Sequence, residues 1–551
     1  MKKPRKVAAL LSTVSPLAFV SLSTTAAVLP ADKQDLTPAK RMSPEAIARA
    51  TDRVRQREFT VFLKPEASSS ASAVVNYFKA LGFAAEYHNA TNAVKLHGNY
   101  AQAEAAGHFK YVADEKQLIT VSAQPTFPAG IAAAIAGTTF PRGPLLTPLA
   151  LPRPPYGTPS TMPCYGASPL DCGYGPADYA ALYNIPTRLN GAGQTVDLVD
   201  FSTFCMSDLT TFQSTFNLTP APNVTAIYLS GVPTGCGSGE PTLDLERVYG
   251  TAPGAIMRVW FAETGFLSQL ADIYEDIATD QARHPASAVT TSYGLEENLL
   301  GLICPSASLC PGSIATLMSN VDRGLSAITG GAAEKVALFA ASGDRGAYCE
   351  LCSPFGLGLE ASGWLTVLFP ASDQWVLAAG GTTLYPQEGA SPGHVAREKE
   401  ACWSGTAPVN YGGSGGGVSS VFRIPTWQLG VSGAASQTYK NVPDLSTVAD
   451  PNTPPLFVYA GVLEPVGGTS ASAPTWAGIA ALINENRAEH GHGPLTNWPG
   501  SIYQVAQSSG DAALTRITEG FNGFYGGSTE RYNNCAGLGV PNVANLVTAL
   551  E

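Results

Sequence analysis

The sequence has few charged residues. Asp, Glu, Lys and Arg make up 14% of its 551 residues, against about 25% in an average soluble protein. Hydrophobic residues make up 45%, so the chain can build a large core and charge-driven disorder is excluded. The net charge of −11 argues against a nucleic-acid-binding protein. The length suggests two to four domains, or one large domain with attachments.

Lysine is scarce in the larger part of the chain. Residues 1–154 carry a net charge of +8 and residues 155–551 a net charge of −19, and the second part contains only Lys335, Lys399 and Lys440. A basic segment before an acidic body suggests a detachable pro-segment that docks on an acidic enzyme, with simple drift in composition as the alternative. An excess of carboxyl groups also suits an acidic medium, where protonation relieves their mutual repulsion.

Long hydrophobic stretches are missing beyond the N-terminus, so no membrane-spanning helix is expected there. The first residues, from Lys2 to Lys6, are basic, and an interrupted apolar stretch follows at 7–22. Small residues up to Ala27 offer a cleavage site, which predicts a signal peptide at 1–27. We therefore expect a protein that is secreted, or exported to the periplasm, and free of the membrane once the signal is removed.

No cysteine occurs before residue 164. The ten that follow are an even number on an exported chain, which favours disulfides. Cys349 and Cys352 form a C-x-x-C pair, but no second pair or nearby histidines complete a zinc site. Spacing does not fix the connectivity, and the local candidate pairs are Cys164–Cys172, Cys205–Cys236 and Cys304–Cys310.

The front of the chain alternates between strand and helix patterns over residues 57–122. Strands are expected at 59–63, 83–87, 93–96 and 118–121, and helices at 71–81 and 100–106. The order β-α-β-β-α-β fits a small ferredoxin-like α+β domain, which we assign to residues 28–124. Ten prolines then follow, and they predict an extended linker at 125–165 that is open to proteolysis.

The body of the chain, residues 166–551, alternates between buried strands and helices. Strands are expected at 195–201, 256–261, 288–292, 336–341 and 375–379, and helices at 243–249, 267–282, 314–329 and 474–487. This alternation predicts a parallel α/β sheet flanked by helices, with active-site residues at the ends of strands.

Two serines are candidates for a nucleophile. Ser470, in Gly-Thr-Ser-Ala-Ser-Ala-Pro, opens an apolar helix whose unsatisfied N–H groups favour negative charge. A helix-capping serine would have a similar context. Ser414, in Gly-Gly-Ser-Gly-Gly, matches the G-x-S-x-G pattern of α/β-hydrolases, but no hydrophobic strand precedes it and no helix follows.

The histidine that usually activates such a serine is missing. The body contains four histidines, and none has the His-Gly-Thr-His setting of subtilisin-type enzymes. It offers Glu240 and Asp244 instead, whose spacing of four puts both carboxylates on one face of a helix. A solvated acidic helix start is the alternative. Apolar neighbours such as Leu243 predict burial, however, and buried paired carboxylates rarely lack a role.

These motifs resemble those of the sedolisins, the serine-carboxyl peptidases with a subtilisin-like fold. Glu240 and Asp244 fall on the family's E-x-x-x-D, and Ser470 falls on its G-T-S. The stretches 369–382 and 414–427 and the front domain are also similar, the last to the family's activation domain.

The resemblance implies a secreted, acid-active endopeptidase made as a zymogen, with 166–551 as the catalytic domain. Ser470 would attack the peptide carbonyl, Glu240 would take its proton, and Asp244 would tune Glu240. Asp344 would donate to the oxyanion, and Asp200, at the end of a predicted strand, would extend the acidic chain.

The partners implied are protein or peptide substrates and the chain's own pro-domain, which would act as an intramolecular inhibitor. A tripeptidyl aminopeptidase of the same family is one alternative. The others are a non-catalytic secreted binding protein on this fold and an esterase that uses Ser414.

The chain departs from the family pattern at the calcium site and in the cleft. Family members usually bind calcium through an Asp-Ile pair, glycine carbonyls and a later Asp, whereas this chain has Arg516, Ile517 and Asn533 there. We therefore expect no calcium and no other cofactor. Arg516 would serve as a built-in cation that bonds the carbonyls, and Cys402 and Cys535 would add a covalent tie.

The substrate cleft is expected to be lined by a tyrosine and a glycine pair. Tyr293 stands where the family often has Trp, and Gly415 and Gly416 follow Ser414. The tyrosine leaves catalysis plausible and the side-chain preference of the cleft open.

Overall fold

A computed structural model describes the chain from residue 52 to residue 551, with several gaps. The gaps are 114–118, 144–145, 153–161, 166–170, 230–236, 238, 263–264, 299–313, 331–334, 349–364 and 405–411. The chain divides into two compact units, Met1–Gln34 and Asp35–Glu551, and every described residue belongs to the second. The expected signal peptide lies outside the described residues.

The small domain is an antiparallel sheet with helices packed on it. Its strands are β1 (Arg57–Leu63), β2 (Ala84–His88), β3 (Ala93–Gly98) and β6 (Ile135–Thr138), in the order β2-β3-β1-β6, and its main helices are α2 (Ala71–Ala80) and α3 (Tyr100–Gly107). Phe59, Phe78, Phe83 and Phe140 meet in its core, where burial of apolar surface stabilises the domain. The expected ferredoxin-like arrangement is confirmed.

The last strand of this sheet differs from the one predicted. The strand expected at 118–121 corresponds to β5 (Ile119–Val121), which pairs with β4 (Tyr111–Ala113) in a separate sheet. The fourth place is taken by β6, antiparallel to β1. The sequence of β6, Ile-Ala-Gly-Thr, has one large apolar residue and lacks the alternation that marks a strand. The sheet therefore draws on a stretch that the sequence assigned to the linker.

The central sheet of the body is mostly parallel. Its order is β10-β11-β9-β12-β14-β16-β17, and β20 also pairs with β16. All these pairs are parallel except β16–β17. The strands are β9 (Thr195–Asp200), β10 (Asn223–Tyr228), β11 (Ile256–Phe261), β12 (Ala288–Thr291), β14 (Ala337–Ala341), β16 (Leu377–Pro386), β17 (Arg397–Cys402) and β20 (Leu445–Val448). The five strands expected from the sequence are confirmed as β9, β11, β12, β14 and β16.

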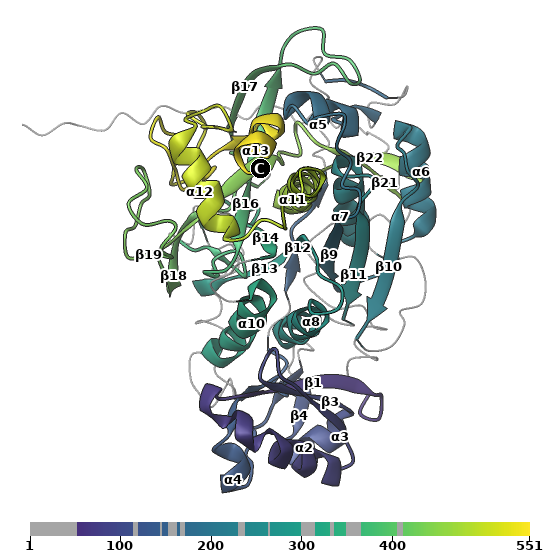
Figure 1. The fold of residues 1–551 in the computed structure, drawn as a ribbon, viewed down its shortest axis with the longest axis vertical. Helices are drawn as coiled ribbons and strands as arrows, with labels where there is room; N and C mark the ends of the chain where they lie inside the picture. Colours follow the sequence, from purple (N-terminus) through teal and green to yellow (C-terminus); the bar gives the residue numbers. More distant parts are fainter. Residues whose placement is uncertain are drawn as a thin grey trace, which may run out of the picture. The chain divides into compact units, whose positions relative to one another are not determined.

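Helices cover both faces of this sheet (Figure 1). On one face lie α7 (Gly239–Thr251) and α11 (Ser472–Glu489), and on the other lie α8 (Leu267–Asp280) and α10 (Ile314–Thr329). Neighbouring residues of one strand alternate between the two cores. Val196 and Leu198 join the core under α7 and α11, whereas Val199 joins the core under α8 and α10. Burial on both faces explains the near-continuous hydrophobic strands, and the four expected helices are confirmed.

The remaining elements are short. The helices are η2 (Pro65–Ser70), α4 (Ala129–Ala132), α5 (Pro176–Leu182), α6 (Met206–Phe216), η5 (Thr469–Ala471), α12 (Trp498–Ser508) and α13 (Val543–Ala549). The strands are β7 (Thr147–Pro148), β8 (Leu151–Pro152), β13 (Tyr293–Glu296), β15 (Leu368–Phe369), β18 (Gly417–Arg423), β19 (Tyr439–Val442), β21 (Leu456–Tyr459), β22 (Val462–Gly467), β23 (Leu514–Thr515) and β24 (Val540–Pro541). Each helix in the described part of the chain is too short or too polar to cross a bilayer.

Two disulfides agree with the pairs expected from the sequence. They join Cys164 to Cys172 and Cys402 to Cys535. Cys205 is also disulfide-bonded, but its expected partner Cys236 lies outside the described residues, as does the expected pair Cys304–Cys310.

Candidate active site

Ser470 lies where strand β22 turns into helix α11. It occupies the single turn η5, and its side chain is fully buried. Gly468, just before it, has a φ of 106°, which favours glycine. A Cβ at Gly468 would lie 2.2 Å from the carbonyl oxygen of Leu149 and 2.7 Å from Oδ2 of Asp344. Glycine is therefore required here because two oxygens converge on the backbone beside Ser470.

Helix α7 brings Glu240 and Asp244 to the same place. The helix packs against η5 and α11, and its two carboxyl groups are 3% and 0% exposed. The Ser292 hydroxyl donates a hydrogen bond of 2.7 Å to Oδ1 of Asp244. No hydrogen bond of ordinary geometry reaches Oε1 or Oε2 of Glu240 from the described residues. The carboxyl of Glu240 thus stays free to accept a proton from a neighbour.

Burial dominates the electrostatics of these carboxyl groups. It raises the pKa of Glu240 well above its usual range, and the charge of Asp244 raises it further, while the nearby Ser470 hydroxyl lowers it. Burial also raises the pKa of Asp244 to about 8, against the hydrogen bond from Ser292. Asp200, at the end of β9, is fully buried, and burial and then the charge of Asp244 raise its pKa. These acids share protons, so they titrate as a group.

Asp344 follows strand β14 and faces the turn that holds Ser470. Thr469 donates two hydrogen bonds to its Oδ1, from the backbone N–H at 2.7 Å and from the hydroxyl at 2.8 Å. Its Oδ2 has no partner among the described residues and points to the space beside Gly468. Burial raises the pKa of Asp344 to about 7, against the two bonds from Thr469. Below that pH the carboxyl keeps a proton that Oδ2 can donate.

Part of the expected linker, residues 146–152, occupies this site, and we call it the seated linker or seated segment. The backbone N–H of Ser470 donates to the carbonyl oxygen of Leu149 at 3.1 Å, and the N–H of Leu149 donates to the carbonyl of Ser292 at 3.0 Å. Before Leu149, strand β7 pairs antiparallel with β13, and after it β8 pairs antiparallel with β22. The carbonyl of Leu149 therefore lies where the N–H of Ser470 and Asp344 can stabilise negative charge on an oxygen.

The arrangement has the parts of an acyl-transfer site. The Ser470 hydroxyl lies beside the carboxyl group of Glu240, and a backbone N–H and a protonated acid flank a peptide carbonyl. The four histidines of the body are all exposed, whereas Ser470, Glu240 and Asp244 are buried.

Comparison with known proteins gives consistent relatives. Kumamolisin from Bacillus sp. is 31% identical over 399 residues, which are 68% of this chain and 63% of kumamolisin. Sedolisin from Pseudomonas sp. is 26% identical over 67% of this chain and 58% of its own length, and tripeptidyl-peptidase 1 from Dictyostelium discoideum is 27% identical over 62% and 52%. The chain belongs to the sedolisin family. It spans about half to two thirds of the length of these relatives, and no family model matches it.

The fold agrees with a solved sedolisin structure. Pseudomonas sedolisin, described as a serine-carboxyl proteinase in complex with two molecules of pseudo-iodotyrostatin, superposes with a TM-score of 0.55. The match has 23% sequence identity and covers 68% of this chain and 97% of that structure. The subtilisin-like α/β fold expected from the sequence is therefore confirmed.

The other serine considered as a nucleophile has a different place in this sedolisin-family chain. The hydroxyl of Ser414 donates to the carbonyl of Cys535 at 2.7 Å and accepts from the N–H of Gly381 at 3.0 Å. Ser414 is fully buried, and no base faces its hydroxyl among the described residues. The esterase alternative thus has no support from the geometry.

The residues expected to line the cleft divide into two groups. Tyr293 belongs to β13 and pairs through its backbone with Pro148 of the seated segment. Gly415 donates to the carbonyl of Gly343 at 2.7 Å. A Cβ at Gly416 would lie 2.2 Å from the carbonyl oxygen of Asn534. Gly415 therefore contacts the segment that carries Asp344, whereas Gly416 lies against Asn534 near the C-terminus.

The residues at the family's calcium position do not fit a calcium ion. Arg516 binds both carboxylate oxygens of Asp511, at 2.7 and 2.9 Å, and one carbonyl, that of Thr529. The carbonyl of Ile517 accepts hydrogen bonds from Asn533 Nδ2 at 3.0 Å and from the N–H of Ser528 at 3.1 Å. Its lone pairs are thus occupied, and neither Arg516 nor Asn533 supplies the carboxylate that calcium prefers.

Three contributors to the site were missed from the sequence. Leu149 lacks any local signal, because its role depends on the path of the linker. Thr469 was visible as the residue before Ser470, but its two bonds to Asp344 depend on the turn at Gly468. Ser292 ends a predicted strand, and a polar residue at a strand end of a parallel sheet was a usable signal.

Proposed function

We propose that this protein is a secreted, acid-active serine-carboxyl endopeptidase made as a zymogen. Ser470 is the nucleophile, Glu240 the base, Asp244 its tuning partner and Asp344 the oxyanion donor. The observation that carries the proposal is the seated linker, in which the carbonyl of Leu149 accepts the N–H of Ser470. The signal pattern at 1–27 supports secretion.

The seated segment supports the bond between Leu149 and Ala150 as the first to be cut. The carbonyl in the oxyanion position belongs to Leu149, so attack by Ser470 would break the bond between Leu149 and Ala150. Ala150 packs with Leu243, Phe457 and Val466. Backbone pairing on both sides of the bond holds it in a substrate-like register.

The same pairing favours an endopeptidase over a tripeptidyl peptidase. A tripeptidyl peptidase has room for three residues before the cut, here Thr147 to Leu149. The chain continues past that limit, since the N–H of Leu146 donates to the carbonyl of Gly265 at 2.8 Å and Gly143 is also described. The seated linker therefore makes a backbone contact before the third residue, which supports an endopeptidase.

The proton chemistry sets the pH range of the reaction. The Ser470 hydroxyl can give its proton to Glu240 only when the Glu240–Asp244 pair has lost one of its own. Asp344 can donate to the oxyanion only while it is protonated, and its pKa is about 7. Activity should therefore rise as the pair loses its first proton, an ionisation that burial moves to higher pH, and fall as the pH passes 7.

The small domain is held on helix α8 by charged and polar contacts. Lys95 lies 2.6 Å from Asp276 and 3.2 Å from Glu275, and the Thr60 hydroxyl donates to Asp272 at 2.7 Å. These contacts support its role as an intramolecular inhibitor, because they hold the linker in the cleft.

A fall in pH acts on the docking of the small domain in opposite directions through two of these acids, Glu275 and Asp272. Burial raises the pKa of Glu275, but Lys95 and His88 outweigh it and lower the pKa to about 2. Its contribution to docking is present above its usual pKa near 4.5 and is lost as the pH falls below that value. Burial raises the pKa of Asp272 to about 6, so protonation of Asp272 favours docking as the pH falls. Release should therefore require a pH below about 4.5.

The first test is mass spectrometry of the secreted protein before and after a shift to pH 4. We expect a cut between Leu149 and Ala150 in the wild type and an intact chain in Ser470→Ala. Thermal melting of both proteins checks that the variant is folded. A variant that is cut at the wild-type rate would exclude Ser470 as the nucleophile.

The second test separates the two peptidase modes. The processed enzyme is given an internally quenched peptide of ten residues with an acetylated N-terminus. An endopeptidase cuts this peptide, whereas a tripeptidyl peptidase needs a free amino group and leaves it intact. Release of tripeptides from the unblocked peptide alone would favour the aminopeptidase.

A further inference from the structure

The loop at the family's calcium position is closed by a side-chain amide. Asn533 donates from Nδ2 to the carbonyl of Ile517 and accepts at Oδ1 from the N–H groups of Cys535 at 3.1 Å and Ala536 at 2.8 Å. One buried Asn thus joins both sides of the loop, as a cation bound to carbonyls would. Buried polar groups that are fully hydrogen-bonded hold a loop in one arrangement.

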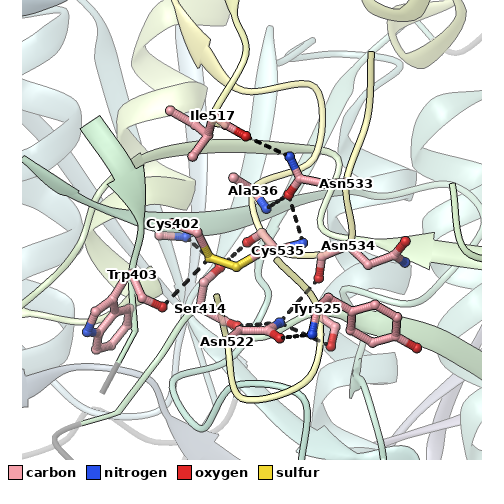
Figure 2. Close-up of a disulfide and its surroundings, with 12 residues drawn as sticks. Cys402, Trp403, Ser414, Ile517, Asn522, Tyr525, Asn533, Asn534, Cys535 and Ala536 are labelled. Carbon is pink, nitrogen blue, oxygen red and sulfur yellow. Dashed lines mark hydrogen bonds between the residues drawn. A yellow bond between two sulfur atoms is a disulfide. The ribbon is translucent and has the colours of Figure 1, made fainter. Parts of the chain in front are cut away.

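A disulfide reinforces the same loop. Cys535, two residues after Asn533, is bonded to Cys402 at the end of β17, and both residues are buried. The two cysteines are 133 residues apart in sequence, so the bond restricts a long stretch of the unfolded chain. Figure 2 shows the disulfide between Asn533 and Ser414.

Ser414 links this loop to a glycine-rich turn. Its hydroxyl donates to the carbonyl of Cys535 at 2.7 Å (Figure 2). Asn522 adds a second link, since its Nδ2 donates to the carbonyl of Ser414 at 3.1 Å and to that of Asn534 at 3.2 Å. The position of Ser414 is therefore set from the C-terminal loop.

The glycine-rich turn in turn holds the oxyanion aspartate. The N–H of Gly413 donates to the carbonyl of Asp344 at 2.8 Å, and the N–H of Gly415 donates to the carbonyl of Gly343 at 2.7 Å. Ser414 lies between these two contacts. A continuous series of bonded groups thus runs from the disulfide to the backbone of Asp344.

We propose that the Cys402–Cys535 disulfide and Asn533 replace calcium in this chain, and that Ser414 is a positioning residue which transmits this support to Asp344. The replacement rests on the contacts of the loop alone. The effect on the reaction rests also on the proposed peptidase function, since it acts through the oxyanion site. The enzyme should therefore need its disulfide and no calcium.

The first experiment tests calcium directly. The processed enzyme is dialysed against EDTA at pH 7.5, where the chelator binds calcium well, and its thermal midpoint is measured before and after calcium is added back. We expect no change in the midpoint. A lower midpoint in EDTA that calcium restores would overturn the proposal.

A variant that restores a carboxylate sharpens this test. Asn533→Asp removes the donor to Ile517 and places a negative charge in the loop, and we expect a lower midpoint that calcium does not recover. Recovery by calcium would show that the loop still holds a calcium site, and would also overturn the proposal.

The second experiment removes the disulfide. We expect Cys402→Ala/Cys535→Ala to lower the midpoint by roughly 5 to 10 °C and to reduce kcat about tenfold with a smaller change in KM. The matched control is Cys164→Ala/Cys172→Ala. It removes a disulfide whose two cysteines are 8 residues apart in sequence and make no contact with Ser414 among those described above. Equal losses of kcat in the two double variants would contradict a specific link to the oxyanion site.

Ser414→Ala keeps the proposal testable even if the double variant fails to fold. It leaves both cysteines in place and removes only the hydroxyl. We expect a drop in kcat together with a shift in the alkaline limb of the pH profile, which a purely structural role would not move. A wild-type kcat and an unchanged alkaline limb would overturn the role of Ser414.

The outcomes also separate this proposal from the peptidase proposal. If the wild type hydrolyses no peptide, the peptidase proposal fails, while the EDTA and Asn533→Asp measurements still decide whether calcium is replaced. If the wild type is active, the kcat and pH measurements decide whether Ser414 positions Asp344.

Discussion

Two buried groups of acids in this molecule have the same kinds of side chain and very different surroundings. On helix α8, Asp272, Glu275 and Asp276 face cations and hydroxyls, above all Lys95. Around Ser470, Glu240 and Asp244 meet no cation among the described residues, and burial raises the pKa of both. A buried acid that is paired with a cation can stay ionised and join two domains, whereas burial without a cation favours the protonated form of the acid.

The largest effect is expected from removing Glu240, the proposed base, which belongs to the group of acids that has no cation. Glu240→Gln has the same shape but cannot take the proton of Ser470, so we expect peptide hydrolysis to fall about a thousandfold. Hydrolysis of a quenched peptide at pH 4 measures it.

The matched control for that variant lies on the same helix. Glu246 is buried and accepts the N–H of Val458 at 2.7 Å, a bond that a Gln side chain can keep. Glu246→Gln should therefore retain most of the activity. A similar loss in both variants would mean that the helix, and not the carboxyl of Glu240, is what matters.

Substitutions of Asp344 distinguish the effect of its charge from the effect of its hydrogen bonds at the oxyanion site. In Asp344→Asn, Oδ1 can still accept both bonds from Thr469, and Nδ2 takes the place of the free Oδ2. We expect activity within about tenfold of the wild type and an alkaline limb that moves above pH 7, because the amide cannot ionise. Asp344→Ala should lose about a hundredfold. The pH dependence of kcat/KM measures the activity of both variants. If the alkaline limb of Asp344→Asn stayed in place, the limb would belong to another group.

Lys95 tests the paired acids. Lys95→Met leaves Glu58, Glu275 and Asp276 close together without their cation, so docking of the small domain should weaken most near neutral pH. We expect processing of the zymogen at pH 6 to be about tenfold faster than in the wild type. Gel electrophoresis of samples taken over time measures the rate. Lys110→Met is the control, since Lys110 is 70% exposed and pairs with Glu104 of its own domain. Equal processing rates in the two variants would show that Lys95 does not hold the small domain in place.

The smallest effect is expected on strand β9, which carries one acid of each kind. Asp197 binds Arg258 at 2.6 and 2.7 Å, whereas both oxygens of Asp200 lack a hydrogen bond of ordinary geometry among the described residues. The raised pKa of Asp200 means that its ionisation destabilises the fold as the pH rises. Asp200→Asn should therefore raise the thermal midpoint by roughly 2 to 5 °C at pH 8 and leave it unchanged at pH 3.

Asp197→Asn should have the opposite sign at pH 8. It leaves the Arg258 cation without its bidentate partner, so the midpoint should fall. Melting curves of the two variants side by side check the contrast, and a fall in both would show that Asp200 also has a stabilising partner.

The central sheet and its helices were predictable from the sequence because their patterns are local. Residues 336–341 form a continuous apolar run typical of a strand covered on both faces, and 314–329 repeats apolar residues at helical spacing. The strand β6 was missed because four residues with a single large apolar side chain do not carry a pattern. Its place is decided by its neighbour β1 and not by its own sequence.

The candidate site was predictable only in part. Glu240 and Asp244 stand out through their spacing, and Ser470 through its helix, so each carries a local signal. The position of Asp344 depended on resemblance, since a Gly-Asp turn is common. The role of Leu149 depended on contacts with residues more than 140 positions away in the sequence, which no local pattern reports.

The seated linker has a consequence for the step that would follow the proposed first cut. Breaking the bond after Leu149 would create a new terminal carboxyl group beside acids that burial holds protonated. A free α-carboxyl has a pKa near 3.5 in water, so at pH 4 and above the new chain end is charged in solvent, whereas burial opposes that charge inside the site. The gain of hydration on leaving would therefore draw the spent segment out of the site that held it.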